Sequence, residues 1–123
     1  MNNQIKLSAD QLADAIKESE EVREYIKAVD DYNNDEEINS LIEKYYSMNT
    51  DFQKIQKART LTQEERDNMK SIVDRLNSNQ LTSNVQNVEN KMLDLLIECN
   101  GEISAVINMD FAKLAAPSTS CCG

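Results

Sequence analysis

Apolar residues recur along this chain at intervals of three and four, the spacing that places side chains on one face of an α-helix. Four such segments follow one another, and short polar residues that suit helix N-caps separate them. They predict helices over about residues 9–31, 34–56, 62–76 and 83–109. Two glycines, one proline and few aromatic residues, with Glu, Lys, Leu and Ile common, also favour long helices over strands, so we expect an all-α fold.

The predicted helix starts share a local signature. A short polar residue is followed three positions later by Glu or Gln, which is the spacing of a capping box or a related cap. The pairs are Ser8 and Gln11, Asn34 and Glu37, Thr62 and Glu65, and Ser83 and Gln86. The polar runs at residues 33–35 and 77–79 separate the segments, because short polar side chains there compete for backbone hydrogen bonds.

The second segment carries the most regular apolar pattern, which we call the seam. Its spacings alternate between three and four, giving the 3.5-residue period of a coiled coil. The seam consists of Ile38, Leu41, Tyr45, Met48, Phe52 and Ile55. Either the chain's own helices cover it as a core, or part of it forms an interface with a helix from another chain.

The lengths of the segments predict how they are arranged. Only residues 57–62 join the second and third segments, so these should form an antiparallel hairpin. At ~1.5 Å per residue the last segment reaches roughly 40 Å, longer than a compact domain of this size needs. Asn100 and Gly101 are the place where it could kink. We therefore predict an elongated antiparallel four-helix bundle that self-associates as a homodimer or a dimer of dimers.

Composition and charge narrow the function classes. The chain has 123 residues, no histidine, and 13 basic against 22 acidic residues, a formal net charge of −9. This charge opposes contact with nucleic acid or an anionic membrane, so proteins are the expected partners. No nucleophile with an adjacent base can be assigned, and we expect no enzyme activity. The absence of a signal peptide and of an apolar run near ~18 residues favours a cytoplasmic protein.

The carboxyl-terminal segment carries the only candidate chemistry. Apolar periodicity stops after Leu114, so we divide the chain into a helical domain, 1–114, and a flexible tail, 115–123. The tail ends in Cys121 and Cys122, which are candidate iron–sulfur ligands; one chain supplies only two of the four thiolates such a cluster usually takes. Zinc ligation, lipidation and an incidental presence of these thiols are the alternatives. Cys99 lies on an apolar helix face and is interpreted as a small buried hydrophobe.

Several motifs, in order, resemble the YlbF/YmcA family of Firmicute bacteria. The similarity covers roughly residues 8–110, and a cysteine-containing tail of small residues adds to it. The matching positions are Leu12 to Glu21 with Tyr25 and Ala28, then Leu41-Ile42, Phe52-Gln53 and Gln56, Leu61 to Glu65, Leu76 to Asn79, Val85, Glu89, and Leu93 to Leu96.

The resemblance implies a small helical regulatory or adaptor subunit. In the best known members, YlbF and YmcA join a third protein, YaaT, in a complex that carries iron–sulfur clusters, supports RNA processing by RNase Y and influences competence, sporulation and biofilm formation. The resemblance therefore implies YmcA-like and YaaT-like proteins and RNase Y as candidate partners. The alternatives from other classes are an iron–sulfur or redox-responsive module that uses Cys121 and Cys122, with a cluster shared with another chain, and a coiled-coil structural scaffold.

Overall fold

The computed structural model describes residues 1–118, and the all-α prediction is confirmed for them. These residues form six helices and no strand. None of the described helices is long and apolar enough to cross a membrane. The helices are α1 (Asn3–Lys17), α2 (Glu20–Asn33), α3 (Glu36–Gln56), α4 (Gln63–Ser78), α5 (Gln80–Ile107) and α6 (Phe111–Ala115).

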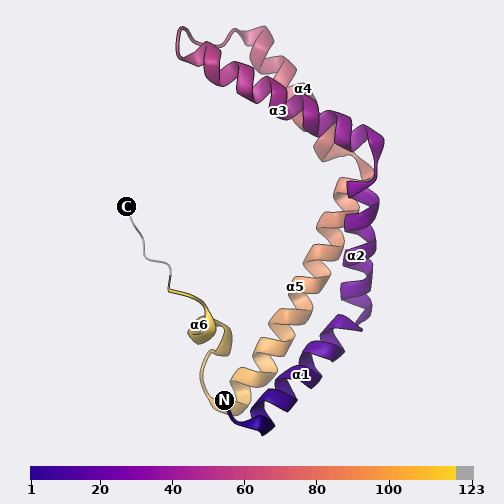
Figure 1. The fold of residues 1–123 in the computed structure, drawn as a ribbon, viewed down its shortest axis with the longest axis vertical. Coiled ribbons are helices and arrows are strands. Elements are labelled where there is room, and N and C mark those ends of the chain that lie inside the picture. The colour runs from indigo at the N-terminus through magenta and orange to yellow at the C-terminus, as the bar shows by residue number, and fades with distance from the viewer. Residues whose placement is uncertain (119–123) are drawn as a thin grey trace.

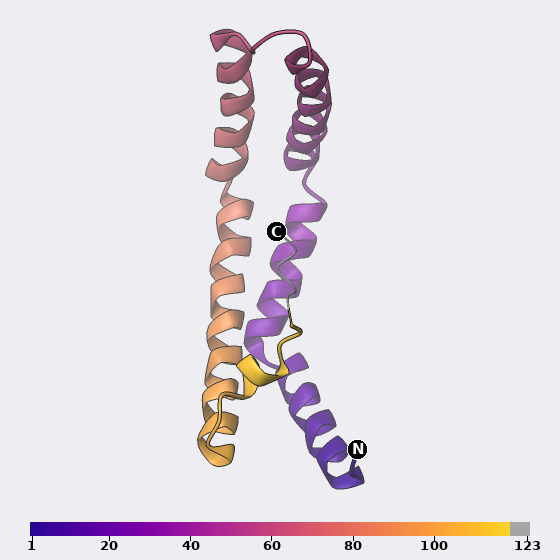
Figure 2. The same ribbon diagram turned by 90° about the vertical axis from the view of Figure 1, so that its left-hand side faces the viewer.

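The helices form a long, bent hairpin (Figure 1). One arm runs through α1, α2 and α3, the chain turns between α3 and α4, and the other arm returns through α4 and α5 (Figure 2). α2 packs along α5, and α3 packs along α4. The antiparallel hairpin of residues 36–78 is thus confirmed, but residues 1–118 do not pack as the predicted four-helix bundle within one chain. The helices instead pair two by two, one pair after the other.

The first predicted helix is two helices in the structure. Ser19, which the sequence pattern placed inside a continuous helix, is the N-cap of α2: its Oγ accepts a hydrogen bond from Val22 N (3.3 Å) and donates one to Ile16 O (2.6 Å). Ser19 fits the apolar spacing of a continuous helix, but its side chain instead caps the start of a new one. The resulting break lets α1 turn away from the line of α2, which shapes the surface described below.

The start of α4 follows the prediction. Thr62 Oγ1 accepts a hydrogen bond from Glu65 N (3.2 Å), and Glu65 Oε1 accepts one from Thr62 N (2.8 Å), which completes a capping box.

The other three helices start elsewhere than predicted, in each case at an earlier or adjacent Asn or Asp. In each case a side-chain oxygen of the Asn or Asp accepts a hydrogen bond from a backbone amide in the first turn of the helix, as an N-cap residue does. The caps observed are Asn2 for α1, Asp35 for α3 and Asn79 for α5. Asn79 separates α4 from α5, so only one residue interrupts the returning arm.

The buried core is small and lies mainly near the bend of the hairpin. Ile38 and Leu41, in the first turns of α3, are 0% and 2% exposed, and Ile72 of α4 is also buried. Ala28 of α2 is the remaining buried apolar residue among those described. No side chain of α1, α5 or α6 reaches this degree of burial. Both ends of the hairpin therefore expose apolar side chains that the chain itself does not cover.

Candidate protein-interaction surfaces

The seam divides into a buried half and an uncovered half. Ile38 and Leu41 are covered within the chain, whereas the four later members are only half-buried. The later members are Tyr45, Met48, Phe52 and Ile55. The core interpretation therefore applies to the first two residues. The interface role stays a prediction for the other four.

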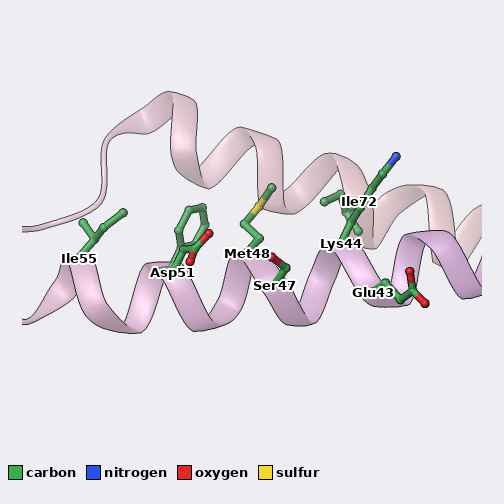
Figure 3. A pocket seen from close by; sticks show the side chains of 8 residues that line it. Glu43, Lys44, Ser47, Met48, Asp51, Ile55 and Ile72 are labelled. Atoms are coloured by element: carbon green, nitrogen blue, oxygen red, sulfur yellow. The ribbon is translucent and has the colours of Figure 1, made fainter.

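A hollow follows the uncovered half of the seam between α3 and α4 (Figure 3). Met48 and Ile55 project from α3 toward α4, and Phe52 and Ile72 also line the hollow. Its volume is about 610 Å³, and Glu43, Lys44 and Asp51 supply charges of both signs at its edge. An apolar floor with a mixed polar rim is the usual anatomy of a protein–protein contact.

A second hollow separates α1 from α5. No Cα atom of α1 comes within 8 Å of a Cα atom of α5, so these two helices do not pack directly. Figure 2 shows α1 diverging from α5 toward the chain's amino terminus. Two adjoining hollows share Leu12 and Ile103, and we call them together the α1–α5 groove. The other lining residues are Gln4, Ile5, Ser8, Ala9, Leu95, Glu98, Cys99, Gly101, Glu102 and Phe111.

Gly101 lies within α5, which runs through this position without the break that the sequence allowed. A Cβ atom at Gly101 would meet no other atom within 4 Å, so this part of the groove is open. The predicted weak point is therefore a regular helical residue, because its backbone retains the α conformation and nothing presses on it.

A network of hydrogen bonds, which the sequence pattern did not predict, holds helix α6 over one end of the groove. Asn100 Oδ1 accepts hydrogen bonds from Ala112 N (2.8 Å) and Ser104 Oγ (3.1 Å), and Ser104 Oγ accepts one from Phe111 N (2.9 Å). The chain reverses at Asn108, the described non-glycine residue with positive φ (56°). Asp110 is the residue from which the sequence could have predicted α6, because Asp is a favoured N-cap and it follows closely after the end of α5. This network places Phe111 at the groove.

The three cysteines lie in two different parts of the chain, helix α5 and the carboxyl-terminal tail. Cys99 is a free thiol that is partly exposed in the α1–α5 groove, so its prediction as a buried hydrophobe is only partly met. Cys121 and Cys122, the candidate cluster ligands, lie outside the described residues. Within residues 1–118 no group of three or more Cys, His, Asp or Glu side chains is placed to hold a metal ion.

Together these features define a class of protein: an elongated helical hairpin whose described surface carries uncovered apolar grooves. Residues 5–108 match the family described as "Control of competence regulator ComK, YlbF/YmcA". The chain belongs to this family, as its motifs indicated.

Among solved structures, the chain is similar to one in "X-ray Crystal Structure of Bacillus subtilis RicA in complex with RicF". The two share 22% sequence identity with a TM-score of 0.70, over 88% of this chain and 96% of the other. This likeness shows the fold alone. A comparison with curated proteins found no significant match.

Proposed function

We propose that this chain is a non-enzymatic regulatory or adaptor subunit that acts through contacts with other proteins. The observation that supports this most directly is its excess of uncovered apolar surface over core. Among the residues that the structure describes, four apolar ones are buried, whereas Ile97, Val106 and Leu114 are 66%, 81% and 66% exposed. Exposed apolar patches rimmed by polar residues are typical of protein interaction sites.

Self-association is part of this proposal. A homodimer or a dimer of dimers would cover the later seam residues and the carboxyl-terminal turns of α5, which the chain leaves open. At 28 residues, α5 is about 42 Å long, and the three residues that follow Ser104 in it are exposed. Burial of such apolar surface in an assembly contributes stability that a lone chain lacks.

The partner proteins and the cellular process that we propose for this chain are those known for its family. We infer that the chain works with YmcA-like and YaaT-like proteins in RNase Y-dependent RNA processing, and thereby influences competence, sporulation and biofilm formation. Family membership supports this inference, as does the similar solved structure, which is a complex of two proteins. An acidic chain with a formal charge of −9 acts on RNA through such partners rather than by touching phosphates itself.

The iron–sulfur proposal concerns Cys121 and Cys122. Two vicinal thiolates can supply half the ligands of a four-iron cluster, and the described residues offer no set that completes it. A second copy or another protein would therefore provide the remaining thiolates. When bound, such a cluster would link chains in a redox-sensitive way.

Deletion of the gene in its native organism tests the adaptor proposal. We expect unprocessed precursors of RNase Y-cleaved transcripts to accumulate, and the wild-type gene to restore their cleavage. Purified protein is expected to leave the same RNA uncut and to form no sub-micromolar complex with it at physiological salt. Unchanged transcript lengths in the deletion strain would contradict the RNase Y role and favour the scaffold alternative. RNA cleavage by the pure chain would contradict the non-enzymatic assignment.

A further inference from the structure

The α1–α5 groove is long, apolar and uncovered along most of its length. Leu12 and Ile103 connect its two halves, Ile5 and Phe111 lie at one end, and Leu95 lies in the other half. The two helices that form its walls do not approach within packing distance of each other. A third helix is the element that fills such a space between two diverging helices, because its side chains can interdigitate with both walls.

The charge of the groove is one-sided. Glu98 and Glu102, one turn apart on α5, are the charged lining residues, and no Lys or Arg among the described residues lines either half. Neither carboxylate forms an ion pair with another described residue. By contrast, the hollows along α3–α4 and α2–α5 each contain lysine beside their acidic residues. The groove is therefore apolar along its length, with an uncompensated negative edge on α5.

From this we infer that the α1–α5 groove binds an amphipathic helix of a partner protein, with an apolar face against Leu12 and Ile103 and Lys or Arg residues one turn apart beside Glu98 and Glu102. This inference rests on the proposed adaptor function and assigns one of its surfaces. Opposite charges at matched helical spacing would set the orientation and register of the bound helix. An anionic partner such as nucleic acid is disfavoured by the same two carboxylates.

A second copy of this chain matches the groove poorly. Cations one turn apart within its described helices occur as Arg23 with Lys27 on α2 and Arg66 with Lys70 on α4. α2 already packs along α5, and α4 along α3, so their apolar faces are used within the chain. Lys70 is also paired with Asp74 at 2.8 Å. The groove therefore fits a partner of different sequence.

Two labelled synthetic helical peptides test this on the full-length chain by fluorescence anisotropy. Both carry the same leucine face; one has Lys and the other Glu at two flanking positions four residues apart. We expect the Lys peptide to bind at least about tenfold more tightly than the Glu peptide at low salt. The double variant Glu98→Lys, Glu102→Lys should reverse this preference, because it reverses the charge at the groove edge.

Matched control variants distinguish the effect of charges at the groove from the effect of the protein's net charge on peptide binding. Asp30→Lys, Glu89→Lys makes the same change in net charge at two exposed positions that line neither the groove nor the α3–α4 hollow, and should keep the wild-type preference. Leu12→Asp should weaken both peptides, whereas Leu7→Asp, on the same helix but outside the groove lining, should not. Circular dichroism verifies that each variant is folded. Equal binding of both peptides, or the same preference in the charge-reversed variant, would overturn the inference.

Two further outcomes also decide the matter. If neither peptide binds while light scattering shows that the charge-reversed variant loses mass, a second copy occupies the groove and the inference is overturned. If the Glu98→Lys, Glu102→Lys gene restores transcript processing fully in the deletion strain, the groove is not used by the partner, yet the adaptor function stands.

Discussion

Arg59 and Glu65 form a bidentate ion pair across the turn that joins α3 to α4. The two guanidinium nitrogens donate to Glu65 Oε1 and Oε2 at 2.8 and 3.2 Å. Glu65 Oε1 also accepts the Thr62 backbone N–H that closes the capping box. One carboxylate therefore fixes both the start of α4 and the path of the preceding turn.

This pair gives a pH prediction. The Arg59 hydrogen bond, with the Thr62 N–H, lowers the pKa of Glu65 from 4.5 to about 2. Because the folded pKa lies below the ordinary value, the pair's stabilisation is fully present above about pH 4.5 and is lost as the pH falls through about 2. The Arg59 side chain is 51% exposed and that of Glu65 is 21% exposed, so solvent and salt screen part of this contribution.

NMR titration of the Glu65 carboxyl carbon should show a midpoint near 2, and Arg59→Ala should move it up toward 4.5. The capping contact with Thr62 remains in that variant, so part of the shift should persist. An identical midpoint in wild type and Arg59→Ala would show that the ion pair does not form in solution.

The later seam residues predict where assembly can be disrupted. Phe52→Asp places a carboxylate on the apolar floor of the α3–α4 hollow, and burying it in an assembled interface is costly without a partner charge. We expect light scattering to report a lower mass than for wild type, or circular dichroism to show loss of folding.

Thr50→Asp is the matched control, since it adds the same charge at an exposed position two residues away. It should leave both mass and helix content unchanged. A wild-type mass for Phe52→Asp would remove this part of the seam from any interface. A wild-type protein that is monomeric at micromolar concentration would contradict self-association itself.

The polar network under α6 predicts a local effect. Asn100→Ala removes the acceptor of Ala112 N and of the Ser104 hydroxyl, so α6 should detach from α5. Hydrogen exchange of residues 111–115 should become faster, while amides in the packed α2–α5 pair keep their protection. Asn90→Ala on the same helix is the control. Unchanged exchange in 111–115 would show that other contacts hold α6.

The tail prediction tests the cluster proposal. Deletion of residues 117–123 should leave the melting temperature nearly unchanged, because Pro117 and Ser118 are exposed and follow the last helix. If Cys121 and Cys122 ligate iron, anaerobically purified protein should be brown, and the Cys121→Ser, Cys122→Ser variant colourless. Cys99→Ser should keep the colour.

Complex formation by the same truncated protein decides whether the tail matters for partners. Loss of partner binding at unchanged stability would support a contact made through the tail, as expected if Cys121 and Cys122 share a metal site with another chain. Unchanged binding and stability would make the two cysteines incidental and leave the interaction to the helices.

The sequence predicted the features of the helices that depend only on residues close together in the chain. The Thr62 capping box and the short connection after α3 involve residues close in sequence, so their geometry follows from backbone chemistry. Ser19 shows the opposite case. Its position fits both an apolar helix face and an N-cap, and periodicity alone cannot choose between them.

The all-helical class, the family, the antiparallel turn and the acidic composition can be read from the chain's residues alone, since helix periodicity, caps and charge are properties of neighbouring residues. That Ile38 is buried while Phe52 is half-buried, and that Leu12 and Ile103 line one groove edged by Glu98, follows from the packing of the helices. These relationships depend on how far α1 diverges from α5 and where the arm bends. Such angles arise from packing between residues distant in sequence, which no local pattern encodes.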